Sequence, residues 1–387
     1  MPIGAMASPR PDHELFPVRR VPTNVWERTG FTPEQERHLN GALLALLFVI
    51  MGGWIYSAAL ALHRGDSPDV ARRIAASASP LSTRAAPDFT FMMDAALRQF
   101  VEHTDWRGES GEVRVVLQYP GDTLALPSPV PEEMEIVYQR VEGGVDTVVV
   151  PDAARPPDEP GIWNMLLRVR GTIRGATAQV PDMSVITTVP ATELRQGRIG
   201  QYRIGNWPAG RSGAYAAPRG FVRVTPENMN THVSRHFQLK DFLTKGQEGV
   251  WPKYVVISPR LLDKLELTIQ ELERMGHPVE NVFVISGFRT PWYNVAGGNP
   301  AGRGALSRHM YGDAADIAID NTRNGCMDDL NGDGRVDVRD ARIIVEAAER
   351  VERRYPHLVG GIGIYRPNPG AHCGMVHIDT RGHRARW

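Results

Sequence analysis

The sequence predicts an α+β protein preceded by an N-terminal membrane segment, and three features of its pattern support this. A long uncharged run comes first, a segment rich in short β-type runs follows, and helical and strand patterns alternate in the last part. The 387 residues suffice for two or three domains with cores of their own. We expect a disordered tail at 1–40, a transmembrane helix at 41–62, a linker at 63–87, a β-rich domain at 88–218 and an α+β domain at 219–387.

The composition excludes several classes of protein. The 44 lysines and arginines balance 44 aspartates and glutamates, so nothing in the net charge favours a nucleic acid as partner. Cysteine occurs twice, at Cys326 and Cys373, which excludes a disulfide-built scaffold and any four-cysteine zinc module. A single disulfide between these two residues stays open, and so does the alternative that each is a small buried side chain.

Residues 41–62, "GALLALLFVIMGGWIYSAALAL", carry no charge over 22 positions. About 20 apolar residues cross the hydrocarbon core of a bilayer as a helix, so we expect one membrane anchor here. The alternative is a cleaved signal peptide with the "ALA" at 59–61 as cleavage site, but the polar leader 1–40 is too long for a signal n-region.

The charges that flank this segment do not settle its orientation. Arg28 and Arg37 lie on one side, and Arg64, Arg72 and Arg73 lie on the other, so the bias in positive charge is small. The orientation has to follow from the function of the later domains.

Residues 88–218 are predicted to be mainly β. Short runs rich in valine, isoleucine, tyrosine and threonine recur, among them "EVRVVLQYP", "MEIVYQRV", "NMLLRVRG" and "MSVITTVP", with proline and glycine between them. This pattern is typical of a small antiparallel sandwich. We interpret it as a spacer or binding domain, because it holds no paired acids, histidine cluster or phosphate loop.

The last part begins with a well-marked helix, "SPRLLDKLELTIQELERMG", at 258–276. Ser258 is expected to cap the helix, Pro259 suits its first turn, and Gly276 ends it. Its apolar stripe consists of Leu262, Leu265, Ile269 and Leu272. The buried strand "NVFVISGFR" follows.

The stretch "SRHMYGDAAD" at 307–316 carries a histidine and an aspartate at metal-ligand spacing. Catalytic zinc needs about three protein ligands and one position open to water, and His309 and Asp316 can supply two of them. The alternating strand "MVHIDT" offers His377 as a third. Asp379, two residues later, is expected on the same face of that strand.

A second metal-binding pattern lies between these ligands, in "DDLNGDGRVDVRDA". Oxygen-bearing side chains alternate, and a glycine stands where the EF-hand calcium loop turns sharply, so we expect a calcium loop at 329–340. Its predicted ligands are Asp329, Asn331, Asp333, Arg335 through its backbone carbonyl, Asp337 and Asp340. The loop resembles a dockerin loop, but it occurs once, which indicates a structural calcium site and not a cohesin partner.

Four stretches in order, "SGFRTPWYN", "SRHMYGDAAD", "GGIGIY" and "MVHIDTRGHRARW", resemble the zinc D-alanyl-D-alanine carboxypeptidase family, which includes VanY-like enzymes. The resemblance covers about 220–387. It implies a zinc peptidase domain with a small antiparallel sheet and flanking helices. It also implies that His309, Asp316 and His377 bind zinc, that Arg289 holds substrate or polarises the scissile carbonyl, and that Ser307 and Tyr365 support substrate binding.

The resemblance leaves the general base unassigned. Many members carry an acid three residues before the last histidine or a histidine two before it, and here those positions are Gly374 and Met375. Asp379 and His372 are the candidates, and we rank Asp379 first. Asp379 is alternatively a residue that orients His377 from behind.

These expectations together predict a membrane-anchored metallopeptidase that hydrolyses amide bonds in peptidoglycan stem peptides, as a D,D-carboxypeptidase or an endopeptidase. Its C-terminal domains would lie outside the cytoplasm, on the periplasmic or cell-wall side of the inner membrane, where calcium and a disulfide belong. Two alternatives stay open: an inactive zinc-containing peptidoglycan-binding module, and an envelope scaffold protein.

Overall fold

The computed structural model describes residues 105–124, 134–142, 147–149, 155–169, 177–298, 303–367 and 372–387. The predicted tail, transmembrane helix and linker at 1–87 lie outside the described residues. Within the described part, no helix is long and apolar enough to cross a membrane. All described residues belong to one compact unit, Ala85–Trp387, of mixed α/β structure with small sheets and few helices.

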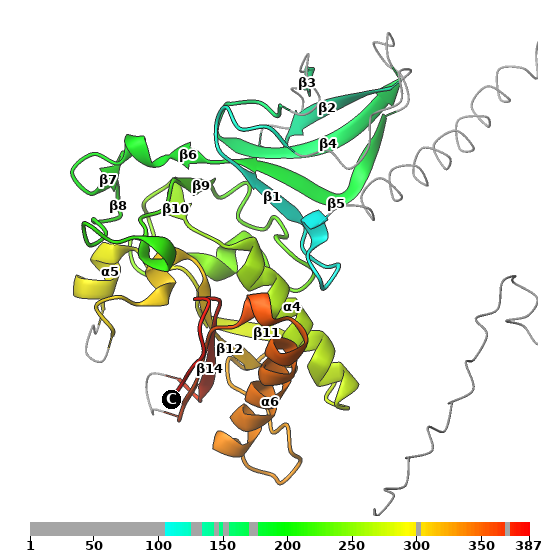
Figure 1. Cartoon of the computed structure of the whole chain (residues 1–387), viewed down its shortest axis with the longest axis vertical. Helices are drawn as coiled ribbons and strands as arrows, with labels where there is room; N and C mark the ends of the chain where they lie inside the picture. Colours follow the sequence, from blue (N-terminus) through cyan, green and yellow to red (C-terminus); the bar gives the residue numbers. More distant parts are fainter. Residues whose placement is uncertain are drawn as a thin grey trace, which may run out of the picture. The chain divides into compact units, whose positions relative to one another are not determined.

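The β-rich segment forms one five-stranded sheet in the described part of the chain (Figure 1). Its order is β1-β5-β4-β2-β3, with β1 parallel to β5 and the other neighbours antiparallel. The strands are β1 (Val115–Gln118), β2 (Met134–Arg140), β3 (Thr147–Val149), β4 (Gly161–Val169) and β5 (Thr177–Thr187). The expected antiparallel sandwich is therefore wrong here, because these strands share one mixed sheet instead of two facing sheets.

This sheet shares its core with the C-terminal region. Val115 on β1 and Ile186 on β5 belong to the same buried cluster as Leu261 of the following helix and Ile378 of the last long strand. The predicted domain boundary at 218 therefore falls within one packed unit, since the two parts bury their apolar faces against each other.

Shorter strands connect the two parts. A three-stranded sheet of order β10-β9-β6 joins β6 (Val189–Pro190), β9 (Gly220–Val224) and β10 (Lys253–Val255), and β7 (Arg198–Ile199) pairs with β8 (Tyr202–Arg203). The 3-10 turns are η2 (Asp105–Arg107), η3 (Ala191–Glu193), η4 (Gly213–Tyr215), η5 (Leu239–Phe242), η6 (Arg308–Tyr311) and η7 (Pro356–Leu358).

The C-terminal sheet has the order β11-β12-β14-β13-β15. It is antiparallel except for the parallel edge pair β13 and β15. Apart from that pair, it is the small antiparallel sheet that was expected for this region. Its strands are β11 (Val282–Ser286), β12 (Ala314–Ile319), β13 (Gly361–Tyr365), β14 (Met375–Asp379) and β15 (Ala385–Arg386). The helices are α4 (Pro259–Arg274), α5 (Pro291–Ala296) and α6 (Val338–Arg354). Helices α4 and α6 pack on each other beside this sheet (Figure 1).

The predicted helix at 258–276 is confirmed as α4, with Leu262, Leu265, Ile269 and Leu272 buried. The expected capping of the N-terminus of α4 by the Ser258 side chain is wrong. The Ser258 side chain makes no capping bond, and its backbone N–H donates to Gly312 O at 2.9 Å. The start of α4 is thereby tied to the loop that carries His309.

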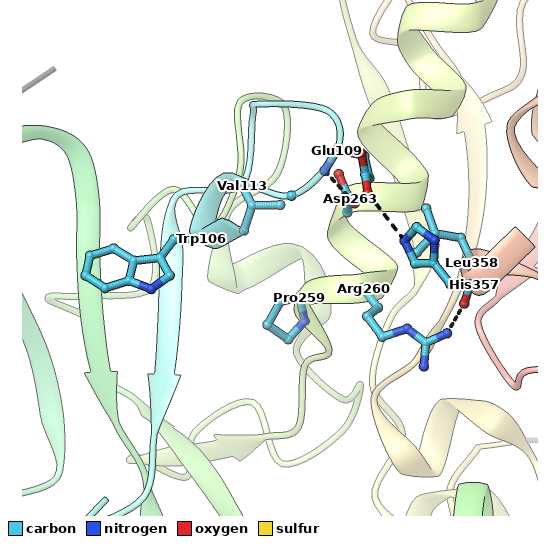
Figure 2. Close-up of a pocket in the computed structure, with 9 residues that line it drawn as sticks. Trp106, Glu109, Val113, Pro259, Arg260, Asp263, His357 and Leu358 are labelled. Atoms are coloured by element: carbon cyan, nitrogen blue, oxygen red, sulfur yellow. Dashed lines mark hydrogen bonds and ion pairs between the residues drawn. The ribbon is translucent and has the colours of Figure 1, made fainter. Parts of the chain in front are cut away.

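The buried carboxylate of Asp263 on α4 holds the turn at 108–110, which precedes β1 (Figure 2). Asp263 accepts backbone hydrogen bonds from Glu109 at 3.0 Å and Ser110 at 2.8 Å. Gly108 precedes them at φ +69°, and a Cβ there would lie 2.5 Å from the Asp263 carboxylate carbon. The turn is therefore held against the helix so closely that it requires glycine. Its residues and Asp263 line a cavity of about 300 Å³.

We expect Asp263→Ala to destabilise the protein by about 2 kcal/mol, because two hydrogen bonds to a charged acceptor are lost. For a domain of this size that lowers Tm by roughly 5 °C. Glu273→Ala, on the exposed side of the same helix, is the matched control and should leave Tm unchanged. Equal melting of the two variants in calorimetry would show that the turn at Gly108 is not held by this carboxylate.

Candidate metal centre

The three predicted ligands meet in one buried group. His309 lies in η6, Asp316 on β12 and His377 on β14, and each is at most 5% exposed. The carboxylate Oδ1 of Asp316 lies 3.2 Å from His309 Nε2 and 2.8 Å from His377 Nδ1. This group can hold a metal ion, and it is the one such group of histidine, cysteine and acidic side chains in the described ranges.

The C-terminal sheet aligns the centre as a row of cross-strand partners. Ser286 on β11 pairs with Asp316, Asp316 with His377, and His377 with Gly363 on β13. Directly paired residues point to the same face of a sheet, so two ligands are set side by side by strand register alone. The third ligand, His309, comes from the loop before β12.

Each histidine has its outer nitrogen occupied by a protein acceptor. His309 Nδ1–H donates to Gly287 O at 2.7 Å, and His377 Nε2–H donates to Asp379 Oδ2 at 3.0 Å. These partners place a proton on His309 Nδ1 and on His377 Nε2. The nitrogens that face Asp316, His309 Nε2 and His377 Nδ1, are then the ones that would bind a metal once free of any proton shared with that carboxylate. Two imidazole nitrogens and one carboxylate oxygen are a donor set that suits zinc.

The electrostatics of the group keep the carboxylate ionised. Burial acts to raise the pKa of Asp316, but the two histidines outweigh burial and hold that pKa far below its usual range. Burial lowers the pKa of His309. Burial also acts to lower the pKa of His377, and hydrogen bonds to Asp316 and Asp379 outweigh it and raise that pKa.

Asp379 lies behind His377, on the nitrogen that faces away from Asp316. It is fully buried, and it also accepts from the backbone N–H groups of Gly361 at 2.7 Å and Arg381 at 3.0 Å. The Arg381 guanidinium pairs with both of its oxygens. These contacts occupy the carboxylate oxygens of Asp379, which fits the alternative role of orienting His377 better than the base role ranked first from the sequence.

His372, the other predicted base, is not part of the metal group. Its Nδ1 accepts from Gly374 N–H at 3.3 Å. Gly374 itself has φ +101°, a conformation that side chains rarely adopt. An acidic residue at this position would therefore be strained.

Arg289 is brought to the centre as predicted. Its Nη2 donates to Asp316 Oδ2 at 2.9 Å and its Nε donates to Ser286 Oγ at 3.0 Å. Its backbone N–H donates to His309 O at 3.1 Å, which fixes the loop. Nη1 makes no hydrogen bond within the described part of the chain, so it is left as a donor. Burial lowers the pKa of Arg289.

The two other expected substrate residues differ in placement. Tyr365 ends β13, is 37% exposed, and its hydroxyl accepts from Trp387 Nε1–H at 3.1 Å. Ser307 begins η6, where its carbonyl accepts from Met310 N–H at 3.1 Å and its side chain makes no capping bond. Ser307 thus shapes the loop through its backbone.

Sequence reasoning missed several residues that support this centre: Ser286, Gly287, Arg381 and Trp387. Trp387 lies with its ring centroid 5.1 Å from that of His377. The sequence did point to Arg381 and Trp387, because both lie in "RGHRARW", part of one of the four quoted stretches. The stretch alone assigns no role to either residue.

In the predicted calcium loop at 329–340, aspartate side chains accept hydrogen bonds from the backbone N–H groups of the loop itself. Asp329 accepts from the N–H groups of Gly332, Asp333 and Gly334, and Asp340, which is fully buried, accepts from those of Leu330, Asn331 and Asp337. Arg339 pairs with Asp333 and Asp337. In the described residues the loop carboxylates do not gather into a metal group. Calcium stays a prediction.

Cys326 and Cys373 form a disulfide, with Cα atoms 5.1 Å apart, which is the first of the two alternatives that the sequence leaves open. The bond links the segment before the loop at 329–340 to the segment before β14. It therefore connects the expected calcium loop to the strand that carries His377.

Comparison with protein-family models, with curated proteins and with solved structures found no match. The function of the chain is therefore inferred from the centre itself and from the sequence stretches described above.

Proposed function

We propose that the chain is a zinc metallopeptidase that hydrolyses amide bonds in peptidoglycan stem peptides. The observation that carries the proposal is the buried group of His309, Asp316 and His377, in which a protein acceptor holds the other ring nitrogen of each histidine. Three ligands leave one position for water, and zinc, when bound, supplies Lewis acidity at that position.

The chain's own residues supply orientation and charge. Arg289 is anchored by Ser286 and Asp316, and its remaining Nη1 can donate to the carbonyl oxygen of a bound amide. A fixed cation of this kind stabilises the negative charge that develops on that oxygen. Asp379 and Arg381 keep the His377 ring in place.

The proposed substrate class comes from the resemblance to D-alanyl-D-alanine carboxypeptidases, and the proposed location follows from it. Peptidoglycan lies outside the cytoplasm, and the disulfide between Cys326 and Cys373 suits an oxidising compartment. We place the unit at 85–387 on the periplasmic or cell-wall side, anchored to the inner membrane by residues 41–62.

A second candidate function is a zinc-containing protein that binds peptidoglycan without cleaving it. Two observations favour it: Asp379 is saturated by donors, and Gly374 replaces the acid expected before His377. Neither predicted base is thus free at the metal group.

One experiment separates the two candidates. The full chain in detergent, loaded with zinc, is incubated with muropeptides that carry pentapeptide stems and cross-links, beside His309→Ala, and products are identified by mass. Loss of one alanine, absent in the variant, indicates a carboxypeptidase, and conversion of cross-linked dimers to monomers indicates an endopeptidase. No product with stoichiometric zinc favours the binding protein.

We also propose that the loop at 329–340 binds calcium and stabilises the disulfide-linked segment. A ligand at 100 times its Kd stabilises a folded protein by about 2.7 kcal/mol, so calcium should raise Tm measurably. Asp333→Ala should abolish this shift, while Glu346→Ala, an exposed acid on α6, should keep it. If saturating calcium leaves the Tm of the wild type unchanged, the loop at 329–340 does not bind calcium.

A further inference from the structure

One lysine side chain is buried between the two long helices and the strand that carries His377. Lys264 lies on α4 and is fully buried. Its Nζ donates to the Glu352 carboxylate on α6 at 2.7 Å and to the main-chain carbonyl oxygen of Asp379 at 2.7 Å. Burial lowers the pKa of Lys264, and the pairing with Glu352 opposes that effect. Lys264 therefore links the helix pair to the residue that holds His377.

The contact with Lys264 falls where β14 leaves its partner strand. The ladder between β13 and β14 ends at Ile378, one residue before Asp379. Beyond it, the Gly361 N–H donates to Asp379 Oδ1 at 2.7 Å, and Lys264 donates to the Asp379 carbonyl oxygen. These two contacts hold the side chain and the main chain of Asp379. They bear on the metal centre because Asp379 Oδ2 accepts from His377 Nε2–H at 3.0 Å.

Glu352 holds both the lysine and the turn that faces Asp379. Its Oε1 also accepts from the Gly360 N–H at 2.9 Å, and its Oε2 pairs with Arg386 on β15. Arg386 Nη1 donates to Gly360 O at 2.8 Å. A Cβ on Gly360 would overlap the carbonyl oxygen of Asp379, so this close approach requires glycine. Glu352 thus has a second cationic partner and keeps one in the absence of Lys264.

Stability alone is a weak reason to bury this ion pair. Desolvation offsets much of the attraction between two buried charges, and apolar residues of similar volume often replace such a pair without loss of stability. An apolar side chain at 264 could not hold the Asp379 carbonyl oxygen, because only a donor can do so. Loss of a partner that orients a metal-binding histidine typically costs about 10- to 100-fold in metal affinity. The buried lysine is therefore better explained by the metal centre that it supports.

We propose that Lys264 is a positioning residue of the metal centre: paired with Glu352, it holds Asp379 in the place from which its carboxylate orients His377. The inference rests on the metal site of the proposed function, and it does not require hydrolysis. It predicts that a change on α4, outside the metal group, weakens zinc binding through Asp379.

The first test is Lys264→Met, which keeps an unbranched side chain and leaves Glu352 paired with Arg386. Zinc affinity of the full chain is measured by competition with a chelator, well below the Tm. We expect zinc binding to weaken by about 10-fold, the lower end of the effect of losing an orienting partner. Unchanged affinity in a folded Lys264→Met protein would overturn the proposal. If this variant does not fold, Glu352→Gln takes its place, and unchanged affinity there has the same meaning.

The matched control is Thr268→Val, one helical turn later on α4. Thr268 is also fully buried, and its hydroxyl donates to Lys264 O at 2.7 Å, but it does not contact Asp379. It should lower Tm and leave zinc affinity within about 2-fold of wild type, because the orienting partners remain. Equal losses of zinc affinity in Thr268→Val and Lys264→Met would show a general effect of destabilisation and would overturn the positioning role.

A double-mutant cycle tests whether Lys264 acts through the Asp379 carboxylate. Without that carboxylate there is nothing left to position, so adding Lys264→Met to Asp379→Ala should weaken zinc binding by about 2-fold or less beyond Asp379→Ala alone. If the two losses multiply in full, Lys264 affects the centre by another route and the proposal is wrong.

Failure of the proposed function can be told apart from failure of this inference, because every readout is zinc affinity. A wild type that binds zinc and cleaves no muropeptide would overturn the peptidase alone. Weaker zinc binding by Lys264→Met would still support the positioning role in that case. A wild type that binds no zinc would overturn both.

Discussion

Replacing His377 with alanine is expected to abolish both zinc binding and hydrolysis. Loss of a partner outside the ligand set already costs about 10- to 100-fold in metal affinity, so removal of a ligand should cost more than that. Hydrolysis should fall by about 10³-fold or more, because the Lewis-acid stabilisation of the reaction is lost. Zinc content by mass spectrometry and product formation from muropeptides measure the two effects.

The control is His383→Ala, since His383 is exposed and lies near β15 without joining the metal group. It should retain full zinc content and turnover. Folding of the His377 variant is checked by circular dichroism, because the change also removes one hydrogen-bond partner each from the buried carboxylates Asp316 and Asp379. A folded His377→Ala protein that keeps stoichiometric zinc would show that the metal is bound elsewhere.

The second large effect is expected at Asp379. Asp379→Ala should weaken zinc binding by about 10- to 100-fold, because His377 loses the acceptor that fixes its tautomer. It should also destabilise the protein, since Arg381 and the Gly361 N–H lose a buried acceptor. Competition with a chelator gives the zinc affinity, and calorimetry gives the stability.

Asp379→Asn distinguishes the orienting role from proton transfer. The asparagine carbonyl can still accept from His377 Nε2–H, so we expect zinc affinity close to wild type and substantial turnover. If Asp379 were the general base, the asparagine variant would bind zinc fully and hydrolyse nothing. That result would reverse the assignment made from the geometry.

The parts of the fold that follow from local pattern could be predicted from the sequence. Helix α4 was predictable because its apolar stripe and its terminal residues agree. The ligands His309, Asp316 and His377 were predictable from the order of their sequence stretches, although 68 positions separate the first from the last. Strand register then brings Asp316 and His377 together.

Other features depend on contacts that no local pattern carries. The role of Asp379 is decided by which ring nitrogen of His377 it meets, and sequence spacing does not specify that. The position of Trp387 depends on parallel pairing of β15 with β13 and on the space left by Gly363. The sandwich prediction failed because β1 to β5 pair in one mixed sheet, whose residues Val115 and Ile186 share a buried cluster with α4 and with strands of the C-terminal region.

X-ray absorption at the zinc edge, on the full chain carrying one equivalent of zinc, tests the metal centre most directly. His309, Asp316 and His377 predict two imidazole nitrogens and one or two oxygens at about 2.0–2.2 Å, with no sulfur. The imidazole signal should be halved in a His309→Ala protein that is forced to bind zinc at high concentration. An all-oxygen shell would instead place zinc at the acidic loop and contradict the proposed centre.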